Sequence, residues 1–129
     1  MELRQNYDKI VALGFQVIAI NPDTPENCCE TIRKYNLPFK VLSDTKVQSA
    51  KDFGIAWEVN DRDEATYEKL RVASGESHRL LPAPAYFIFD TKGIIQFEHV
   101  NPNHRVRPPF SLMLVGAEIV KGIIETPDN

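Results

Sequence analysis

The sequence predicts an α/β sandwich with a mixed sheet, on the basis of three observations. Short apolar runs alternate with stretches of helical periodicity, as expected when strands alternate with helices around one core. The run 15–20 is apolar almost throughout, which is typical of a strand that is covered on both faces. The runs 85–89 and 94–99 flank a turn at 90–93 and predict an antiparallel hairpin.

Cap and turn residues delimit the helices of the N-terminal half. Apolar side chains at helical spacing over 3–13 predict a first helix, and Gly14 is placed to end it as a left-handed C-terminal cap. Thr24 is a typical N-cap residue and Pro25 suits the first helical position, so a second helix is predicted over 25–35. The strand 15–20 therefore connects two helices.

The rest of the chain extends the predicted order to α-β-α-β-α-insert-β-β-α. Between the second helix and the hairpin lies a charged stretch, residues 57–75, which we expect to be partly helical and partly loop. The remaining predicted elements are a strand over 39–42, a helix capped by Asp44 or Thr45 and ended by Gly54, a helix over 64–72, and a final helix over about 109–122.

Length, charge and cysteine content narrow the class of protein. A chain of 129 residues forms about one domain. Its 15 basic and 18 acidic side chains give a net charge of -3 with no long run of one sign, which disfavours nucleic acid or a membrane surface as the main partner. We see no secretory signal and no apolar run of the roughly 20 residues that span a bilayer. The only two cysteines are adjacent, which is no disulfide framework, so we expect a cytoplasmic protein.

A family resemblance is carried by three blocks, which are GFQVIAINPDTPEN, LPFKVLSDTKVQSAKDFGIAWEV and LPAPAYFIFDTKGIIQFEHVNPNHRVR. In their order and spacing they resemble the alkyl hydroperoxide reductase/thiol-specific antioxidant (AhpC/TSA) family, the peroxiredoxin-like branch of the thioredoxin superfamily. The resemblance covers nearly the whole chain and implies a single thioredoxin-like domain over 1–129. It also implies an antioxidant oxidoreductase with a thiol reductant, and we expect no cofactor.

Two residues resemble neighbours of the family's active site. Pro84 stands where the family has a cis-proline that opens a strand beside the reactive group, and an X-Pro bond disfavours cis by only about 0.5–1 kcal/mol. We therefore expect Pro84 to be cis and Pro82 to be trans. The alternative is that both prolines begin an edge strand in trans. Trp57 is expected in the core or the pocket wall, or at the entrance to the active site.

The resemblance also implies that two parts of the family's site are missing. The family's reactive cysteine stands at the start of the first main helix, where free N–H groups and the helix dipole favour a thiolate. Residues 1–4 resemble the stretch directly after that cysteine, so we expect a domain that is incomplete at the N-terminus and has no counterpart of it. Gln96 occupies the place of an arginine that polarises the peroxide, and an amide supplies no charge.

Cys28 and Cys29 are the remaining redox candidates. Neighbours on a helix project about 100° apart, so a disulfide between them would break the helical turn. Core packing, an exposed reactive thiol and a catalytic role stay open for them, and core packing fits their place in an apolar stripe. His78, His99 and His104 are scattered and form no metal-ligand pattern, so no metal site is predicted.

Two functions are compatible with these features. The first is a peroxiredoxin-like oxidoreductase that is inactive as given, because the segment with the reactive cysteine is absent. The second is a non-catalytic thioredoxin-like module for binding or assembly. Without a strand between 15–20 and 85–89, both of these strands would expose unpaired backbone edges, and such edges recruit partners. We therefore expect a homodimer.

Overall fold

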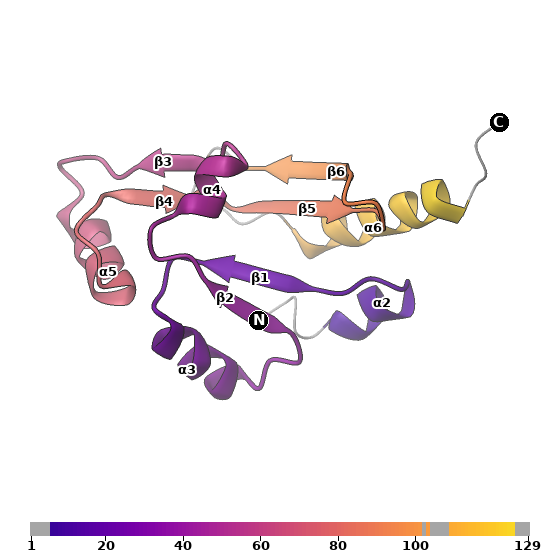
Figure 1. Ribbon diagram of the computed structural model, residues 1–129, viewed down its shortest axis with the longest axis horizontal. Helices are drawn as coiled ribbons and strands as arrows, with labels where there is room; N and C mark the ends of the chain where they lie inside the picture. Colours follow the sequence, from indigo (N-terminus) through magenta and orange to yellow (C-terminus); the bar gives the residue numbers. More distant parts are fainter. Residues whose placement is uncertain (1–5, 102, 104–108, 126–129) are drawn as a thin grey trace. The chain divides into compact units, whose positions relative to one another are not determined.

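The computed structural model describes residues 6–101, 103 and 109–125 (Figure 1). Contacts within the chain divide it into two compact units. Ile18–Ala83 form the first, here called the middle unit, and Met1–Val17 together with Pro84–Asn129 form the second, the terminal unit. The prediction of a single domain over 1–129 stays a prediction, and the two units are considered one at a time.

The middle unit contains a parallel pair of strands. β1 (Ile18–Asn21) and β2 (Lys40–Ser43) pair in register, from Ile18 opposite Lys40 to Asn21 opposite Ser43. α3 (Pro25–Tyr35) makes the crossover between them, packs against β2 and lies beyond β2 in Figure 1. A crossover helix of this kind is the usual connection between parallel strands.

Two short strands and two helices complete the middle unit. α4 (Gln48–Asp52) leads into β3 (Ala56–Glu58), and α5 (Glu64–Ser74) follows β3 along the chain. β4 (Leu80–Pro82) then pairs antiparallel with β3. The charged stretch predicted as an insert over 57–75 therefore contains a helix, as expected. It begins in β3 and is followed along the chain by β4, the partner strand of β3.

The terminal unit is an antiparallel hairpin with α6 (Phe110–Glu125) packed on it and α2 (Tyr7–Ala12) packed against α6. β5 (Ala85–Phe89) pairs with β6 (Ile95–Val100). α2 precedes the hairpin along the chain, and α6 follows it and packs against both strands. The core of this unit consists of Ile88, Ala117 and Val120, with Leu13, Phe15 and Phe97 packed against them.

Most predicted elements are present, and the α/β class is confirmed. The helix over 25–35 and the hairpin lie where the sequence places them. The carboxylate of Asp44 accepts from the N–H groups of Gln48 and Ser49 at 2.9 and 3.0 Å, so Asp44 caps α4 as predicted. Two elements were missed, β3 and β4, because each has only three residues and β4 ends in a proline, a residue that weakens a strand signal.

Within the part of the chain that the structure describes, the strands form three ladders of two strands each, one parallel and two antiparallel. Both strand directions of a mixed sheet are thus present. In the described residues, β1 pairs only with β2 and β5 pairs only with β6. The strand predicted at 15–20 begins only at Ile18, because Phe15 packs into the core of the terminal unit instead.

The cis bond expected at Pro84 is wrong. The described residues contain no cis peptide bond, so the Ala83–Pro84 bond is trans. Ala83 N–H donates to Ile55 O at 2.8 Å, and Pro84 O accepts from Asn101 N–H at 2.9 Å. The backbone on both sides of this bond is thus held while the bond keeps the intrinsically favoured isomer.

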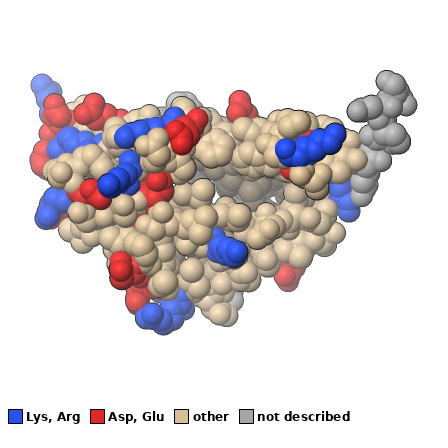
Figure 2. All heavy atoms as spheres, viewed as in Figure 1, with Lys and Arg blue, Asp and Glu red and all other residues tan. Residues whose placement is uncertain are grey.

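Charged side chains of both signs are interspersed on the face that Figure 2 shows. Some form ion pairs within one helix, such as Arg71 and Glu68 of α5 at 2.7 Å. Exposed pairs of this kind contribute little to stability. None of the described helices is both long enough and apolar enough to span a bilayer.

Candidate redox site

The five predicted site residues belong to different parts of the fold. Cys28, Cys29 and Trp57 lie in the middle unit, and Pro84 and Gln96 lie in the terminal unit. The two cysteines share the first half of α3. Trp57 and Gln96 lie in strands, and Pro84 directly precedes β5.

The start of α3 is fixed by its own sequence. Thr24 Oγ1 accepts from Asn27 N–H at 3.2 Å, and Pro25 occupies the first turn. Asn27 Nδ2 donates to Ala73 O at 2.9 Å, which anchors this turn on the end of α5. In this orientation of the helix Cys28 is buried.

Cys28 is a buried and neutral thiol. It is 2% exposed, and its Sγ donates to Asn21 Oδ1 at 3.1 Å. Burial raises the pKa of the Cys28 thiol above its ordinary value, and the neighbouring Asp23 and Cys29 raise it further. The N–H of Cys28 already donates to Thr24 O at 2.9 Å, so it is not one of the free amides of a helix start that stabilise a thiolate. Cys28 is therefore a poor nucleophile at neutral pH.

Cys29 differs from its neighbour in exposure. It lies on the exposed side of α3, and both cysteines are free thiols. Its place in the helix is beyond the first four N–H groups, which are the ones that lack helical partners. Cys29 therefore offers an accessible sulfur, at a position past the anion-stabilising start of the helix.

Gln96 forms a hydrogen bond with an aspartate of the hairpin turn. Its Nε2 donates to Asp90 Oδ2 at 3.0 Å, while Asp90 Oδ1 accepts from the N–H groups of Lys92 and Ile94 at 2.9 and 3.0 Å. The Gln96 amide and these backbone donors hold the pKa of Asp90 below its usual value. The sequence analysis did not predict the hydrogen bond between Gln96 and Asp90. An aspartate at the start of a glycine-containing turn commonly accepts hydrogen bonds from that turn, and this pattern was visible in the sequence.

Trp57 and Pro84 are both half-buried. Trp57 lies in β3 opposite Leu81 of β4, and Pro84 lies between β4 and β5. The position of Trp57 fits a packing role within the middle unit. Their place beside a reactive group stays a prediction.

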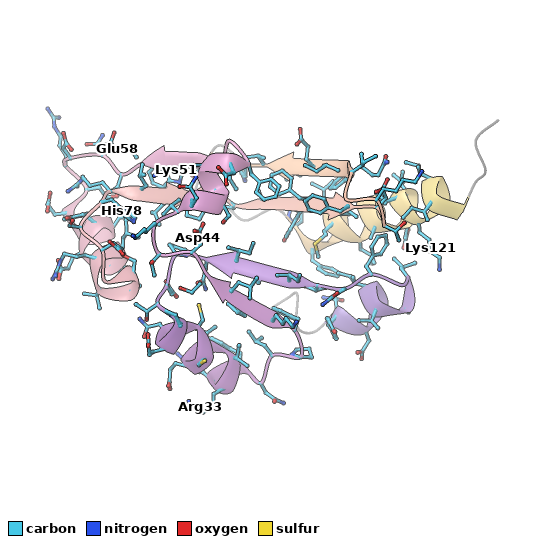
Figure 3. All side chains as sticks on the ribbon, in the orientation of Figure 1. Arg33, Asp44, Lys51, Glu58, His78 and Lys121 are labelled. Atoms are coloured by element: carbon cyan, nitrogen blue, oxygen red, sulfur yellow. The ribbon has the colours of Figure 1, made fainter. Side chains whose placement is uncertain are left out.

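The histidines do not converge on a common site. His78 Nε2 donates to Thr45 O at 2.6 Å, and its Nδ1 accepts from Leu80 N–H at 3.1 Å, so His78 links the start of β4 to the loop before α4 (Figure 3). His99 lies in β6, and His104 lies outside the described residues. In the part of the chain that the structure describes, no three His, Cys, Asp or Glu side chains are grouped as metal ligands.

Comparison with known proteins gives three consistent results. A family model described as the AhpC/TSA family matches residues 1–98. Over 98 residues the chain is 26% identical to chloroplastic peroxiredoxin Q of Populus jackii. The matched region is 76% of this chain and 38% of that protein. Over 53 residues it is 38% identical to a protein named putative peroxiredoxin bcp of Haemophilus influenzae. This matched region is 41% of this chain and 34% of that protein.

The fold has a solved counterpart as well. A crystal structure of peroxiredoxin 6 from Arenicola marina is similar with a TM-score of 0.70 and 15% sequence identity, over 99% of this chain and 57% of that one. The chain thus spans between 34% and 57% of the length of the proteins that it resembles.

Proposed function

Because the chain belongs to the AhpC/TSA family, we propose that it provides the scaffold of a peroxiredoxin-like antioxidant oxidoreductase and that its own two cysteines do not carry the peroxidase reaction. The observation that carries this proposal is the state of Cys28, which is buried and kept as a neutral thiol. A thiol donor is the proposed reductant of this oxidoreductase. A reducing cytoplasm is the proposed location, in keeping with two free cysteines.

The chemistry of peroxide reduction sets the requirements. A thiolate sulfur attacks one oxygen of the O–O bond, an S–O bond forms as a sulfenic acid, and the other oxygen leaves and takes up a proton to become water or an alcohol. The sulfur must be ionised and accessible, and a donor must stabilise the charge on the leaving oxygen. Cys28 is neither accessible nor ionised at neutral pH, and the Gln96 amide is already bonded to Asp90.

The experiment that tests this proposal is a turnover assay with a cysteine-free control. Loss of hydrogen peroxide and of an organic hydroperoxide is followed with dithiothreitol as reductant, for the wild type and for Cys28→Ser/Cys29→Ser. We expect equal rates for the two proteins, because neither thiol is set up for the attack. A wild-type rate above that of the double variant would overturn the proposal, and the single variants would then show which sulfur reacts.

A second candidate function, a non-catalytic module for binding or assembly, is favoured by one bare surface of the middle unit. Ile18, Ile20 and Leu42 are 51%, 47% and 46% exposed. Parallel strands are normally covered on both faces, and contiguous exposed apolar side chains mark interaction sites. We propose that another polypeptide covers this surface, and that the simplest such assembly is a homodimer.

A further inference from the structure

Residues 60–78 form an excursion between β3 and β4 that contains α5 (Figure 1). The ladder of β3 and β4 brings the two ends of this excursion together, and Val59 N–H donates to Arg79 O at 2.7 Å directly beyond the ladder. The Arg79 guanidinium also donates to Val59 O and Asn60 O at 3.3 and 3.0 Å. The excursion is therefore closed at its base, where it leaves and re-enters the strand pair at one place.

Contacts within the excursion brace it as one body. Tyr67 Oη donates to Ser77 O at 2.8 Å, and the Arg79 guanidinium lies 4.0 Å from the centre of the Tyr67 ring. Asp63 caps α5 by accepting from Thr66 N–H at 3.1 Å. These contacts join α5 to the segment that returns to β4 and to the base of the excursion. Residues 60–78 can therefore keep their internal structure when their contacts with α3 break.

Apolar packing contributes little to the attachment of α5. In the residues that the structure describes, no other helix or strand packs extensively against α5. Within 60–78, all of which is described, Leu70 is the one apolar side chain that is buried. A groove of about 760 Å³ runs between α3 and α5, with Glu30 of α3 and Glu68 of α5 among its lining residues. Segments with few buried apolar contacts open at a lower free energy than the whole protein.

Hydrogen bonds at Ala73 O tie the end of α5 to α3. This oxygen accepts from Thr24 N–H and from Asn27 Nδ2, both at 2.9 Å. Both donors belong to the start of α3, and α3 packs against β2. Each such bond adds only modest net stability, because water takes the place of the lost partner when the bond breaks. The tie at Ala73 O is therefore strong enough to place α5 and weak enough to be released.

We propose that residues 60–78 are a lid that opens away from α3, with a hinge at the base beside Arg79 and a latch at Ala73 O. Opening breaks the two hydrogen bonds at Ala73 O and widens the groove between α3 and α5. The ladder of β3 and β4, the contacts of Arg79 and the pair of β1 and β2 stay intact. The groove thus has an open and a closed state, and a ligand that binds one state more tightly shifts the balance toward it. This inference does not depend on the proposed function.

Hydrogen exchange of the full chain at low urea concentrations, followed by mass spectrometry, tests the lid. Amides of α5 should exchange through an opening that depends less on urea than the exchange of β2, because opening exposes less surface than unfolding. Asn27→Asp keeps the size of the side chain and suits the start of a helix, but it replaces the donor to Ala73 O by a carboxylate. We expect exchange in 64–78 to become at least about two-fold faster in this variant, and exchange in β2 to stay unchanged.

Glu30→Gln is the matched control, since it also exchanges a carboxylate and an amide of equal size on α3 in the same groove. The partner of Glu30 is Arg33 of α3 itself, at 2.9 Å, so α5 should exchange as in the wild type. Wild-type α5 amides that exchange only together with those of β2 would overturn the lid, and this result does not depend on the folding of any variant. Unchanged α5 exchange in Asn27→Asp, or equal acceleration in α5 and β2, would overturn the latch at Ala73 O.

Discussion

Cys28 and Cys29 have different environments although they are neighbours in sequence. One step along α3 turns a side chain by about 100°, which is enough to bury one sulfur beside Asn21 and expose the other. The sequence left core packing and an exposed thiol open for both residues, because it does not show which face of α3 packs against β2. Gln96 gives a second example: the family resemblance predicts that this position lacks a charge, but only the structure shows that the Gln96 amide donates to Asp90.

The raised pKa of Cys28 leads to a prediction about stability at alkaline pH. In the unfolded chain a thiol ionises near its ordinary pKa of about 8.5, whereas the folded protein keeps Cys28 protonated to higher pH. The folded state therefore loses relative stability as the pH rises above the unfolded value and through the folded one. We expect the free energy of unfolding in urea to fall more steeply from about pH 7.5 to about pH 10 for the wild type than for Cys28→Ala. Cys29→Ala is the control and should keep most of the steeper fall, because burial, the largest cause of the raised Cys28 pKa, remains in that variant. Parallel curves for the wild type and Cys28→Ala would refute the prediction.

At the scale of secondary structure, elements with a local chemical signal could be predicted and elements set by packing could not. Helix starts could be predicted from the hydrogen-bonding and backbone preferences of single residues, namely Thr24, Pro25 and Asp44. The start of β1 depends instead on Phe15, whose apolar side chain looks like part of the strand but packs in the terminal unit. β3 and β4 are too short to show an alternating pattern.

A glycine in α6 provides a prediction at this scale. A Cβ atom added at Gly116 would lie 3.0 Å from three ring carbons of Phe97, whereas one added at Gly122 would meet nothing within 4 Å. Replacing glycine by alanine in a helix gains about 1 kcal/mol, but overpacking a core contact costs about 1–3 kcal/mol. We expect Gly122→Ala to raise the free energy of unfolding by up to about 1 kcal/mol, and Gly116→Ala to be less stable than Gly122→Ala by about 1–3 kcal/mol. Urea denaturation measures both free energies of unfolding. Equal stabilisation by the two substitutions would contradict the prediction, because it would mean that the Phe97 ring moves aside without cost.

At the scale of the whole molecule, the family could be recognised from sequence because the three blocks keep their order and spacing along the chain. The roles of single residues could not be transferred in the same way. Pro84 is trans, Gln96 holds a turn, and the candidate thiols lie on a helix that sequence alone could not orient. Similar backbones carry different sites, so the function depends on the chemistry of these side chains.

The most direct test of the claim that neither thiol is set up to reduce a peroxide is to capture the first product of the reaction. The folded chain and the urea-unfolded chain are treated with hydrogen peroxide and dimedone, which traps sulfenic acid, and the adducts at Cys28 and Cys29 are quantified by mass spectrometry over time. We predict that Cys28 stays unmodified while the protein is folded, and that Cys29 reacts no faster in the folded chain than in the unfolded one. An adduct that forms faster at either cysteine in the folded chain would contradict the claim, because folding would then have activated that sulfur.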